Sequence, residues 1–307
     1  MGLVYHNGRF IPEEHIQKAT DADRVLRLLR SFLDANEPGL VRILVRTWNS
    51  QGKAITYKEL RECILSGDIK QEWLEDWMQD YSRFVKDHLQ PAWERAIEAG
   101  VEEMNRRFPL WNFDPMGDAM RSWTANHAAE FITNVSTTQI EGIRAVVRRA
   151  ASLGDMGVDE LARAIRPMIG LTKPDAVANM RYYENLRKNG VTPKRARESS
   201  LYYSARKHRD RAYDIARTEL ATAYNTGAFE GSKQAQADGL LGKCIKKWST
   251  ALDEKRCSVC KSMEGVEVAM DEEFGAASGT WSTKLHPPAH PRCRCGFLII
   301  EVEPPKF

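Results

Sequence analysis

Residues 192–234 read TPKRARESSLYYSARKHRDRAYDIARTELATAYNTGAFEGSKQ, and this stretch decides how most of the chain is interpreted. Thr192 is a residue type preferred at a helix N-cap. Pro193 suits the first helical position, because its fixed φ and missing N–H do no harm there. The stretch predicts one long helix, or two helices in tandem, within a mainly α protein.

The helical pattern extends on the N-terminal side from about residue 21 to 110, after an irregular arm over residues 1–20. One face of a helix predicted there carries apolar and aromatic side chains at intervals of four: Ile69, Trp73, Trp77, Tyr81 and Val85. Such a stripe is either a packed face or an aromatic binding platform. We favour packing, because helical spacing is typical of a core face. We expect Pro91 to break or kink this helix.

Two further boundaries follow along the chain. Residues 106–118, RRFPLWNFDPMGD, contain two prolines and a glycine and predict a linker or long turn. Beyond it, Ser136 and Gln139 match a capping box and so predict a helix start. Gly154 stands where a C-cap glycine would end that helix.

The sequence changes character near residue 239. Short β-like pieces, CIKKWST, GVEVAM and FLIIEVE, are separated there by glycine, proline and cysteine. We predict three regions: a helical N-terminal region of unknown role (1–110), a helical region ending in a long basic helix (111–238), and a Cys/His-rich α+β unit (239–307). The fold class is therefore mainly α with a small C-terminal α+β unit, which we expect zinc to stabilise.

The composition is that of an ordinary globular protein, with 42% hydrophobic and 28% charged residues and a net charge of only +3. This charge predicts no strong whole-molecule attraction to nucleic acid or membrane. The start of the chain, MGLVYHNGRFIPEEH, lacks the apolar segment of a signal peptide. We expect a soluble protein made in a reducing cytoplasm, where stable disulfides are rare.

Four of the six cysteines gather near the C-terminus, as C-x-x-C at Cys257 and Cys260 and, with His290, as H-x-x-C-x-C at Cys293 and Cys295. Two short ligand clusters separated by a loop are typical of a structural zinc site. Our preferred ligands are Cys257, Cys260, His290 and Cys293, with Cys295 as the substitute. A unit this small has little core of its own, and a bound metal would explain how it folds.

Other interpretations of the cysteine cluster stay open. The cysteines could form disulfides after later exposure to oxidising conditions, or remain free buried thiols. Cys257 could be a nucleophile with His286 or His290 as its base, although four clustered cysteines are an odd way to supply one activated thiol. A hydrolytic zinc site would need a general base, for which Asp253 and Glu264 are the local candidates.

Residues 181–217 hold eleven Lys or Arg against four acidic residues, with tyrosines interleaved. The candidate nucleic-acid contacts are Arg195, Arg197, Arg206, Lys207, Arg209 and Arg211. One interpretation is a phosphate-binding surface, which would bind DNA through backbone charge and be sensitive to salt. The other is a solvated helix face, which we favour because helices of ordinary proteins are often locally basic.

The segment IARTEL contains Arg217 and Glu219, which could be mistaken for catalytic residues. They lie two positions apart on a helix and so do not share a face. We expect a buried polar network that orients the C-terminal unit against the long helix. Glu219 is a candidate to reach a lysine or the segment around Trp248.

Three blocks occur in order: IARTELATAYNTGAFEGS, KKWSTALDEKRCSVCKSMEG and PPAHPRCRCGF. With them the chain resembles the Mu F-like minor head, or head morphogenesis, proteins of tailed bacteriophages. The motif residues are Ala216–Glu219, Trp248, Asp253, Cys257, Cys260, His290, Pro291, Cys293, Arg294 and Cys295. The resemblance covers residues 136–300 in style and 210–297 in motif, and the first 110 residues carry no matching motif.

The resemblance implies a structural minor capsid protein of the phage head that acts in head morphogenesis or genome delivery, including DNA ejection. It implies the portal protein as partner, with major capsid or scaffold protein as further candidates. It also implies localisation in the virion after synthesis in the host cytoplasm. We expect non-specific DNA contact at most, no membrane and no catalysed reaction. The alternative is a nucleic-acid-binding module with a structural zinc, or, less favoured, a nuclease or other hydrolase.

Overall fold

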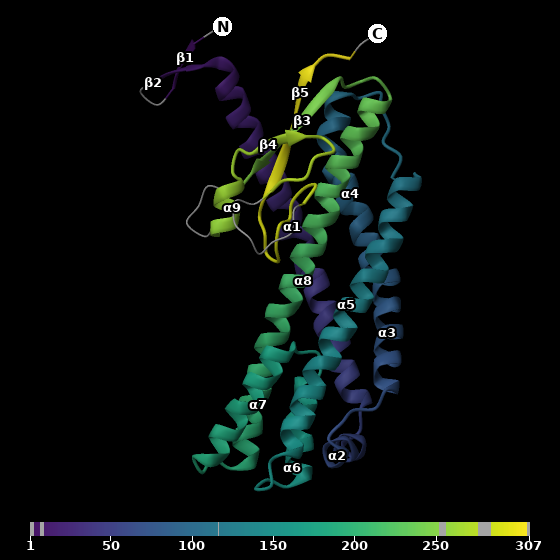
Figure 1. Ribbon diagram of the computed structural model, residues 1–307, viewed down its shortest axis with the longest axis vertical. Helices are drawn as coiled ribbons and strands as arrows, with labels where there is room; N and C mark the ends of the chain where they lie inside the picture. Colours follow the sequence, from purple (N-terminus) through teal and green to yellow (C-terminus); the bar gives the residue numbers. More distant parts are fainter. Residues whose placement is uncertain (1–2, 7–8, 116, 252–255, 276–283, 306–307) are drawn as a thin grey trace. The chain divides into compact units, whose positions relative to one another are not determined.

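The computed structural model describes residues 3–6, 9–115, 117–251, 256–275 and 284–305. About 70% of the chain is helical, and its one three-stranded antiparallel sheet among the described residues lies near the C-terminus. The expected fold class, mainly α with a small C-terminal α+β unit, is confirmed (Figure 1).

The helices and strands follow one another in a simple order. The helices are α1 (Glu13–Ala54), α2 (Tyr57–Ser66), α3 (Glu72–Phe84), the π-helical η1 (Val85–Leu89), α4 (Gln90–Arg107), α5 (Asp118–Ala151), α6 (Val158–Ile165), the 3-10 helix η2 (Arg166–Met168), α7 (Lys173–Lys188), α8 (Pro193–Ala237) and α9 (Ser258–Met263). The strands are β1 (Leu3–His6), β2 (Arg9–Pro12), β3 (Lys243–Ser249), β4 (Glu267–Ala269) and β5 (Gly296–Glu303).

The stretch that begins at Thr192 forms one helix, α8, and not two in tandem. The Thr192 hydroxyl accepts the backbone N–H of Arg195 at 3.4 Å, and the Thr192 carbonyl accepts that of Ala196 at 2.9 Å. These are the bonds of an N-cap, which supply acceptors that the first helical N–H groups otherwise lack. The predicted helix start is therefore confirmed.

The N-terminal arm is not irregular, as expected, but pairs β1 with β2 in an antiparallel hairpin before α1 begins at Glu13. Each strand has only four residues, too few for an alternating pattern to stand out in the sequence. The predicted turn is confirmed, since α4 ends at Arg107 and α5 begins at Asp118.

The capping box predicted at Ser136 and Gln139 is wrong, because α5 runs from Asp118 through both residues to Ala151. Both side chains are buried at mid-helix. Gln139 Nε2 donates to Gln51 Oε1 at 3.0 Å, and the Tyr81 hydroxyl donates to Gln139 Oε1. Gln139 is thus used in a buried hydrogen-bond chain, whereas the buried Ser136 hydroxyl has no hydrogen-bond partner among the described residues.

Pro91 does not break the chain of helices that runs from α3 to α4. The break or kink expected at Pro91 is instead a π-helical turn, η1, which ends two residues before Pro91. A π-helical turn is one recognised way to disturb regular helical bonding locally near a residue that lacks its N–H. The chain therefore continues in helical form with one wider turn.

The chain divides into two compact units. The first comprises Met1–Glu37, Ala92–Met120 and Ile215–Phe307, and the second comprises Pro38–Pro91 and Arg121–Asp214. Helices α1, α5 and α8 each contribute residues to both units. The three regions expected along the sequence, with boundaries at 110 and 238, stay predictions.

The core of the second unit contains the aromatic stripe of α3. Trp73, Trp77 and Tyr81 are each at most 4% exposed, so the expected packing role is confirmed. Trp48 of α1 is fully buried, and its indole N–H donates to the Tyr81 hydroxyl at 2.7 Å. These bulky side chains supply much of the apolar area that stabilises a helical core.

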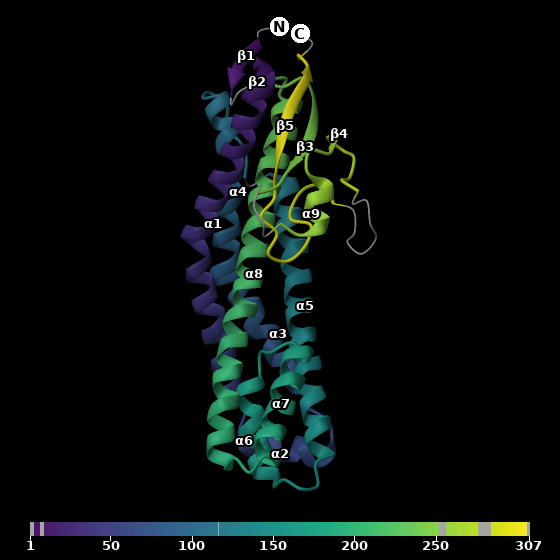
Figure 2. The same cartoon turned by 90° about the vertical axis from the view of Figure 1, so that its left-hand side faces the viewer.

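In the first unit the small sheet has the order β4-β3-β5, with both pairs antiparallel. It lies beside the C-terminal half of α8 (Figures 1 and 2). The Lys246 ammonium on β3 lies 5.0 Å from the centroid of the Phe229 ring on α8. Helices α4 and α8 approach closely, since a Cβ on Gly100 would overlap the carbonyl oxygen of Tyr224.

No helix among the described residues combines the length and the hydrophobicity needed to cross a bilayer.

Candidate metal centre

The first half of the candidate site is built at the start of the short helix α9. Cys257 is its N-cap, and its Sγ accepts the backbone N–H of Cys260 at 3.3 Å. The C-x-x-C spacing therefore turns the chain so that both thiols face one side. A backbone N–H directed at sulfur also favours the thiolate form that metals bind.

The second half is a tight turn of four residues, from His290 to Cys293. The Cys293 N–H donates to the His290 carbonyl at 3.1 Å, Pro291 occupies the second position, and Arg292 has φ 61°. This is the pattern of a type II turn, whose third position favours glycine. The turn places His290 and Cys293 on the same side of the loop.

The His290 ring is oriented by its own loop. Its Nδ1 lies 2.7 Å from the Pro291 carbonyl oxygen. Because a carbonyl only accepts hydrogen bonds, Nδ1 carries the proton and Nε2 keeps its lone pair. Metal-binding histidines are commonly fixed in this way by a carbonyl behind the ring. Nε2 is thus the atom presented to the cysteines.

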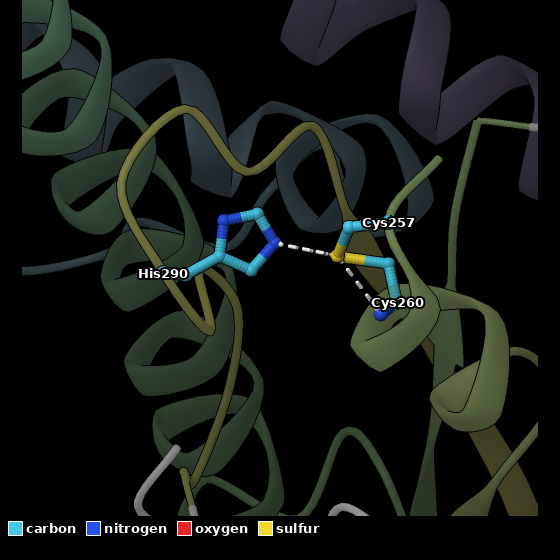
Figure 3. Close-up of side chains that lie close together, drawn as sticks. All are labelled: Cys257, Cys260 and His290. Atoms are coloured by element: carbon cyan, nitrogen blue, oxygen red, sulfur yellow. Dashed lines mark hydrogen bonds between the residues drawn. The ribbon is translucent and has the colours of Figure 1, made fainter. Parts of the chain in front are cut away.

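The two halves converge (Figure 3). His290 Nε2 lies 3.1 Å from the Sγ atoms of both Cys257 and Cys260. Cys260 Sγ lies 3.8 Å from Cys293 Sγ. Two sulfurs at ~2.3 Å from a tetrahedral zinc ion are about 3.8 Å apart, so this pair fits, and the sulfur–nitrogen pairs need to open by a few tenths of an ångström.

All five residues expected as ligands are brought together. They form two overlapping groups, Cys257–Cys260–His290 and Cys260–Cys293–Cys295, and the donor atoms within each group lie within 4.8 Å of one another. Cys260 is common to both. These groups could hold a metal ion. The cavity they line is about 50 Å³, which is room for an ion but not for a substrate.

The site lies at the edge of the core of the C-terminal sheet. Cys260, Cys293 and Cys295 are at most 4% exposed and pack with Trp248 and Phe274, whereas Cys257 is exposed. Trp248 and Phe274 meet edge to face at 5.1 Å between ring centroids. Such burial excludes water from most of the donor set.

The buried thiols influence one another's ionisation. Contact with Cys293 raises the pKa of Cys260, and the same contact lowers the pKa of Cys293 well below its usual value. Burial raises the pKa of Cys257, but the backbone N–H of Cys260 and the His290 ring outweigh it and lower the pKa overall. Several thiolates this close together repel one another, so a bound cation would favour their ionised forms.

The catalytic interpretation loses its first candidate base. His286 packs between the rings of Phe229 and Phe297, at centroid distances of 5.7 and 6.2 Å, and burial lowers its pKa to about 4. Glu264 accepts the backbone N–H of Thr250 at 2.6 Å, which is a structural role. Asp253, the other proposed base and a motif residue, lies outside the described residues.

The interpretation of the cysteine cluster as disulfides is not supported by the structure. All six cysteines lie in the described part of the chain, and all six are free thiols. Cys63 and Cys244, the two solitary cysteines, are buried, and burial raises the pKa of each. They are therefore unreactive core residues, as their solitary positions suggest.

Lys246 supports the site and was missed by reasoning from sequence. It is fully buried on β3, and its ammonium donates to the carbonyls of Glu272 and Leu285, both at 2.8 Å. It thereby ties β3 to the segment at Leu285, which leads to His290. The alternation along the strand could have indicated that Lys246 is buried, because Cys244, Lys246 and Trp248 share the buried face of β3.

The six basic candidates for nucleic-acid contact lie in different environments. Arg211 is buried, with its guanidinium donating to the Gly170 carbonyl and lying 5.0 Å from the centroid of a Trp48 ring. Lys207 pairs with Asp175 at 2.9 Å. Arg195, Arg206 and Arg209 are exposed, and Arg197 is half-buried. The structure therefore presents three of the six freely to solvent.

Arg217 takes part in a polar network, as expected, and two of its partners are on α1. Its Nε donates to Glu37 at 2.6 Å and its Nη2 lies 3.4 Å from Asp34, so it ties α8 to α1. Glu37 is only 2% exposed. The expected role of this network in orienting the C-terminal unit against α8 stays a prediction.

Comparison with known proteins agrees with the resemblance seen in the motifs. The family model described as Phage Mu protein F like protein matches residues 141–298, just over half of the chain. The match includes all five metal-ligand candidates. No curated protein and no solved structure matches the chain. The chain therefore belongs to the Phage Mu protein F like family, which indicates a phage head morphogenesis protein.

Proposed function

We propose that the C-terminal unit is a zinc-clamped structural module. The observation that carries this is the convergence of His290 Nε2 with the thiols of Cys257 and Cys260, and of Cys260 with Cys293. The preferred tetrad is Cys257, Cys260, His290 and Cys293. Thiolates with one imidazole are a common set for structural zinc, and a closed set leaves no open position for chemistry.

Cys295 is then a buried neighbour of the metal and not a ligand. Cys293 has its Sγ 3.8 Å from that of Cys260 and belongs to the same turn as His290. These two observations favour Cys293 as the fourth ligand.

The test is elemental analysis of the full chain purified under reducing conditions. We expect one zinc per chain, lost in Cys260→Ala and Cys293→Ala and retained in Cys295→Ala. Cys63→Ala and Cys244→Ala are matched controls, since both remove a buried thiol outside the cluster. Metal-free protein with six titratable thiols would rule out the proposal. If Cys295→Ala loses zinc and Cys293→Ala keeps it, the fourth ligand is Cys295 and not Cys293.

At the level of biology, we propose a minor structural protein of the virion that associates with the portal and acts in head assembly or genome delivery. The support is family membership together with a compact unit whose donor set is suited to structure. We assign no reaction. Further candidate partners are the major capsid and scaffold proteins.

Co-expression with the portal protein of the same phage tests this proposal. We expect affinity-tagged chain to capture the portal at a fixed stoichiometry, and zinc-free Cys260→Ala protein to capture less. Cys63→Ala is the control for thiol removal as such. No capture of portal by well-folded, zinc-loaded protein would contradict portal association and leave the metal site standing.

A second candidate function, non-specific DNA binding, rests on the exposed residues Arg195, Arg206 and Arg209 of α8. The Arg206 guanidinium lies 5.5 Å from the centroid of the Tyr203 ring. Charge reversal at these three arginines should abolish binding to random DNA at low salt. Binding that persists in the triple variant, or that is absent from the unmodified chain, would exclude this surface.

A further inference from the structure

A pocket of about 510 Å³ opens within the second unit. It is formed by the end of α1, the start of α2, the α6–η2 segment and the N-terminal half of α8. Trp48, Tyr57, Ile169 and Leu201 provide much of its apolar lining. The volume falls in the range of ligand pockets, which is ~300–1,000 Å³, and the metal-site residues take no part in it.

The charged lining of this pocket is strongly unbalanced. It comprises Lys53, Arg163, Arg166, Arg197 and Glu198. Within the described part of the chain, Lys53, Arg163 and Arg197 make no ion pair, whereas Lys207 and Arg211 on the same helix α8 are both bound to protein groups. Cations that share a concave site repel one another, so the site favours an anion.

Arg166 is held in position by the backbone. Its Nε donates to the Gly52 carbonyl at 2.8 Å and its Nη2 to the Lys53 carbonyl at 2.9 Å. Its guanidinium lies 4.6 Å from the centroid of the Tyr57 ring. The Nη1 group makes no hydrogen bond to any described residue. A guanidinium fixed on one side by carbonyls and aromatic contact is preorganised to bind an anion on the other.

The excess of three positive charges in one small volume selects the kind of anion. A phosphate monoester or diphosphate carries two or more charges on one compact group, and guanidinium groups match its oxygens in pairs. A peptide would need about three acidic side chains in the same space. The apolar wall then remains for a flat or uncharged part of the ligand.

We propose that this pocket binds a phosphate-bearing compound of nucleotide size, with the phosphates among Arg163, Arg166 and Arg197. The uncharged part of the ligand rests against Tyr57 and Leu201, which are 44% and 51% exposed in the free protein. The ligand is either a free nucleotide or the phosphorylated end of a DNA strand. Both present the same chemistry to the pocket.

Isothermal titration calorimetry on the full chain tests the proposal. The probes are ADP, inorganic pyrophosphate, a trinucleotide with and without a 5′-phosphate, and hexaglutamate as the acidic peptide. The pocket variant combines Lys53→Gln, Arg163→Gln and Arg197→Gln. The matched control combines Arg181→Gln, Lys188→Gln and Lys194→Gln, which remove the same charge from exposed positions of α7 and α8 outside the pocket.

We expect ADP or the 5′-phosphorylated trinucleotide to bind, with affinity at least tenfold lower in the pocket variant and within twofold of the original in the control. Preference for ADP identifies a free nucleotide, and preference for the phosphorylated trinucleotide identifies a strand end. Equal losses in both variants would show general charge attraction and overturn the proposal. Absence of binding, or hexaglutamate binding as tightly as ADP, would overturn it too, and circular dichroism melting checks that both variants fold.

Discussion

Lys246 shows how much one buried residue depends on its surroundings. Its ammonium is fully buried between the rings of Phe229 and Phe274, 5.0 and 5.2 Å from their centroids, and donates to two loop carbonyls. Burial lowers its pKa to about 8 from a usual value of 10.5. The unfolded chain therefore binds this proton more tightly than the folded chain between these two pH values.

The resulting pH dependence is a testable prediction. Because the folded pKa is depressed, the free energy of unfolding should rise as pH increases from 8 to 10.5, by up to about 3 kcal/mol from this lysine. Urea unfolding of the original protein and of Lys246→Met at pH 8 and pH 10 measures it. The rise should be smaller in Lys246→Met, and equal slopes in both proteins would contradict the prediction.

His208 should make the free energy of unfolding depend on pH at the acidic end of the range. It is buried in the second unit, its Nε2 lies 2.9 Å from the Ile169 carbonyl oxygen, and burial lowers its pKa to about 4 from 6.5. The stability it contributes is present above pH 6.5 and is lost as pH falls towards 4, by about 3 kcal/mol.

His208→Gln keeps a donor for that carbonyl without the titration. Thermal unfolding between pH 7 and pH 4 should therefore show a smaller loss of stability in His208→Gln than in the original protein. His88→Gln, at an exposed position on η1, is the control for removing a histidine as such. A profile that is identical in all three proteins would show that His208 is not the responsible group.

At the scale of single residues, sequence reasoning identified the donor set and missed its supports. C-x-x-C and H-x-x-C-x-C have fixed local geometry, so Cys260 and His290 were predictable from spacing alone. Lys246 was not, because a lysine in a short strand is usually exposed. Arg211 was misjudged as a surface candidate for the same reason. A charged residue is expected at the surface, and only tertiary packing shows which charged residues are buried.

The crossing of α4 and α8 depends on two glycines. A Cβ on Gly227 would overlap the Ile97 carbonyl, and one on Gly100 would overlap that of Tyr224, so both helices use glycine to bring their backbones together. Gly227 lies in the segment AYNTGAFEG, within the residues that the family model matches. In this chain Gly227 therefore allows close packing of the two helices.

Gly227→Ala should destabilise the protein by about 3 kcal/mol, because the backbone cannot yield to a methyl group as a flexible side chain would. Gly39→Ala is the matched control, since Gly39 lies inside α1 and a Cβ added there would meet no atom within 4 Å. Alanine there should stabilise the helix by roughly 0.5–1 kcal/mol. Chemical denaturation measures both, and a Gly227→Ala protein as stable as the original would contradict the close crossing.

At the scale of elements, helix type was predictable and some helix boundaries were not. Thr192 and Pro193 are local start residues, and α8 begins there. Ser136 and Gln139 have the residue types of a capping box but lie inside α5, where Gln139 bonds to Gln51 and Tyr81. Capping residues satisfy helix ends or buried partners equally well, and the choice depends on residues distant in sequence.

At the scale of the whole molecule, the metal should stabilise one unit more than the other. The donors belong to the first unit, and binding energy of a structural zinc is folding energy of the segment that holds it. Chelation should therefore remove amide hydrogen-exchange protection from β3 and β5 while α7 of the second unit stays protected. Loss of protection in both units at once would show that they unfold as one.

The sequence by itself determined the helical class, the change of character near residue 239, the donor cluster and the family resemblance. Each depends on spacing within a short segment, which physical periodicity or turn geometry fixes locally. Only the tertiary structure decided that Lys246 is buried, that Arg217 pairs with Glu37, and that cations from α1, α6, η2 and α8 line one pocket. These features join residues that lie far apart in the sequence, and packing alone brings such residues together.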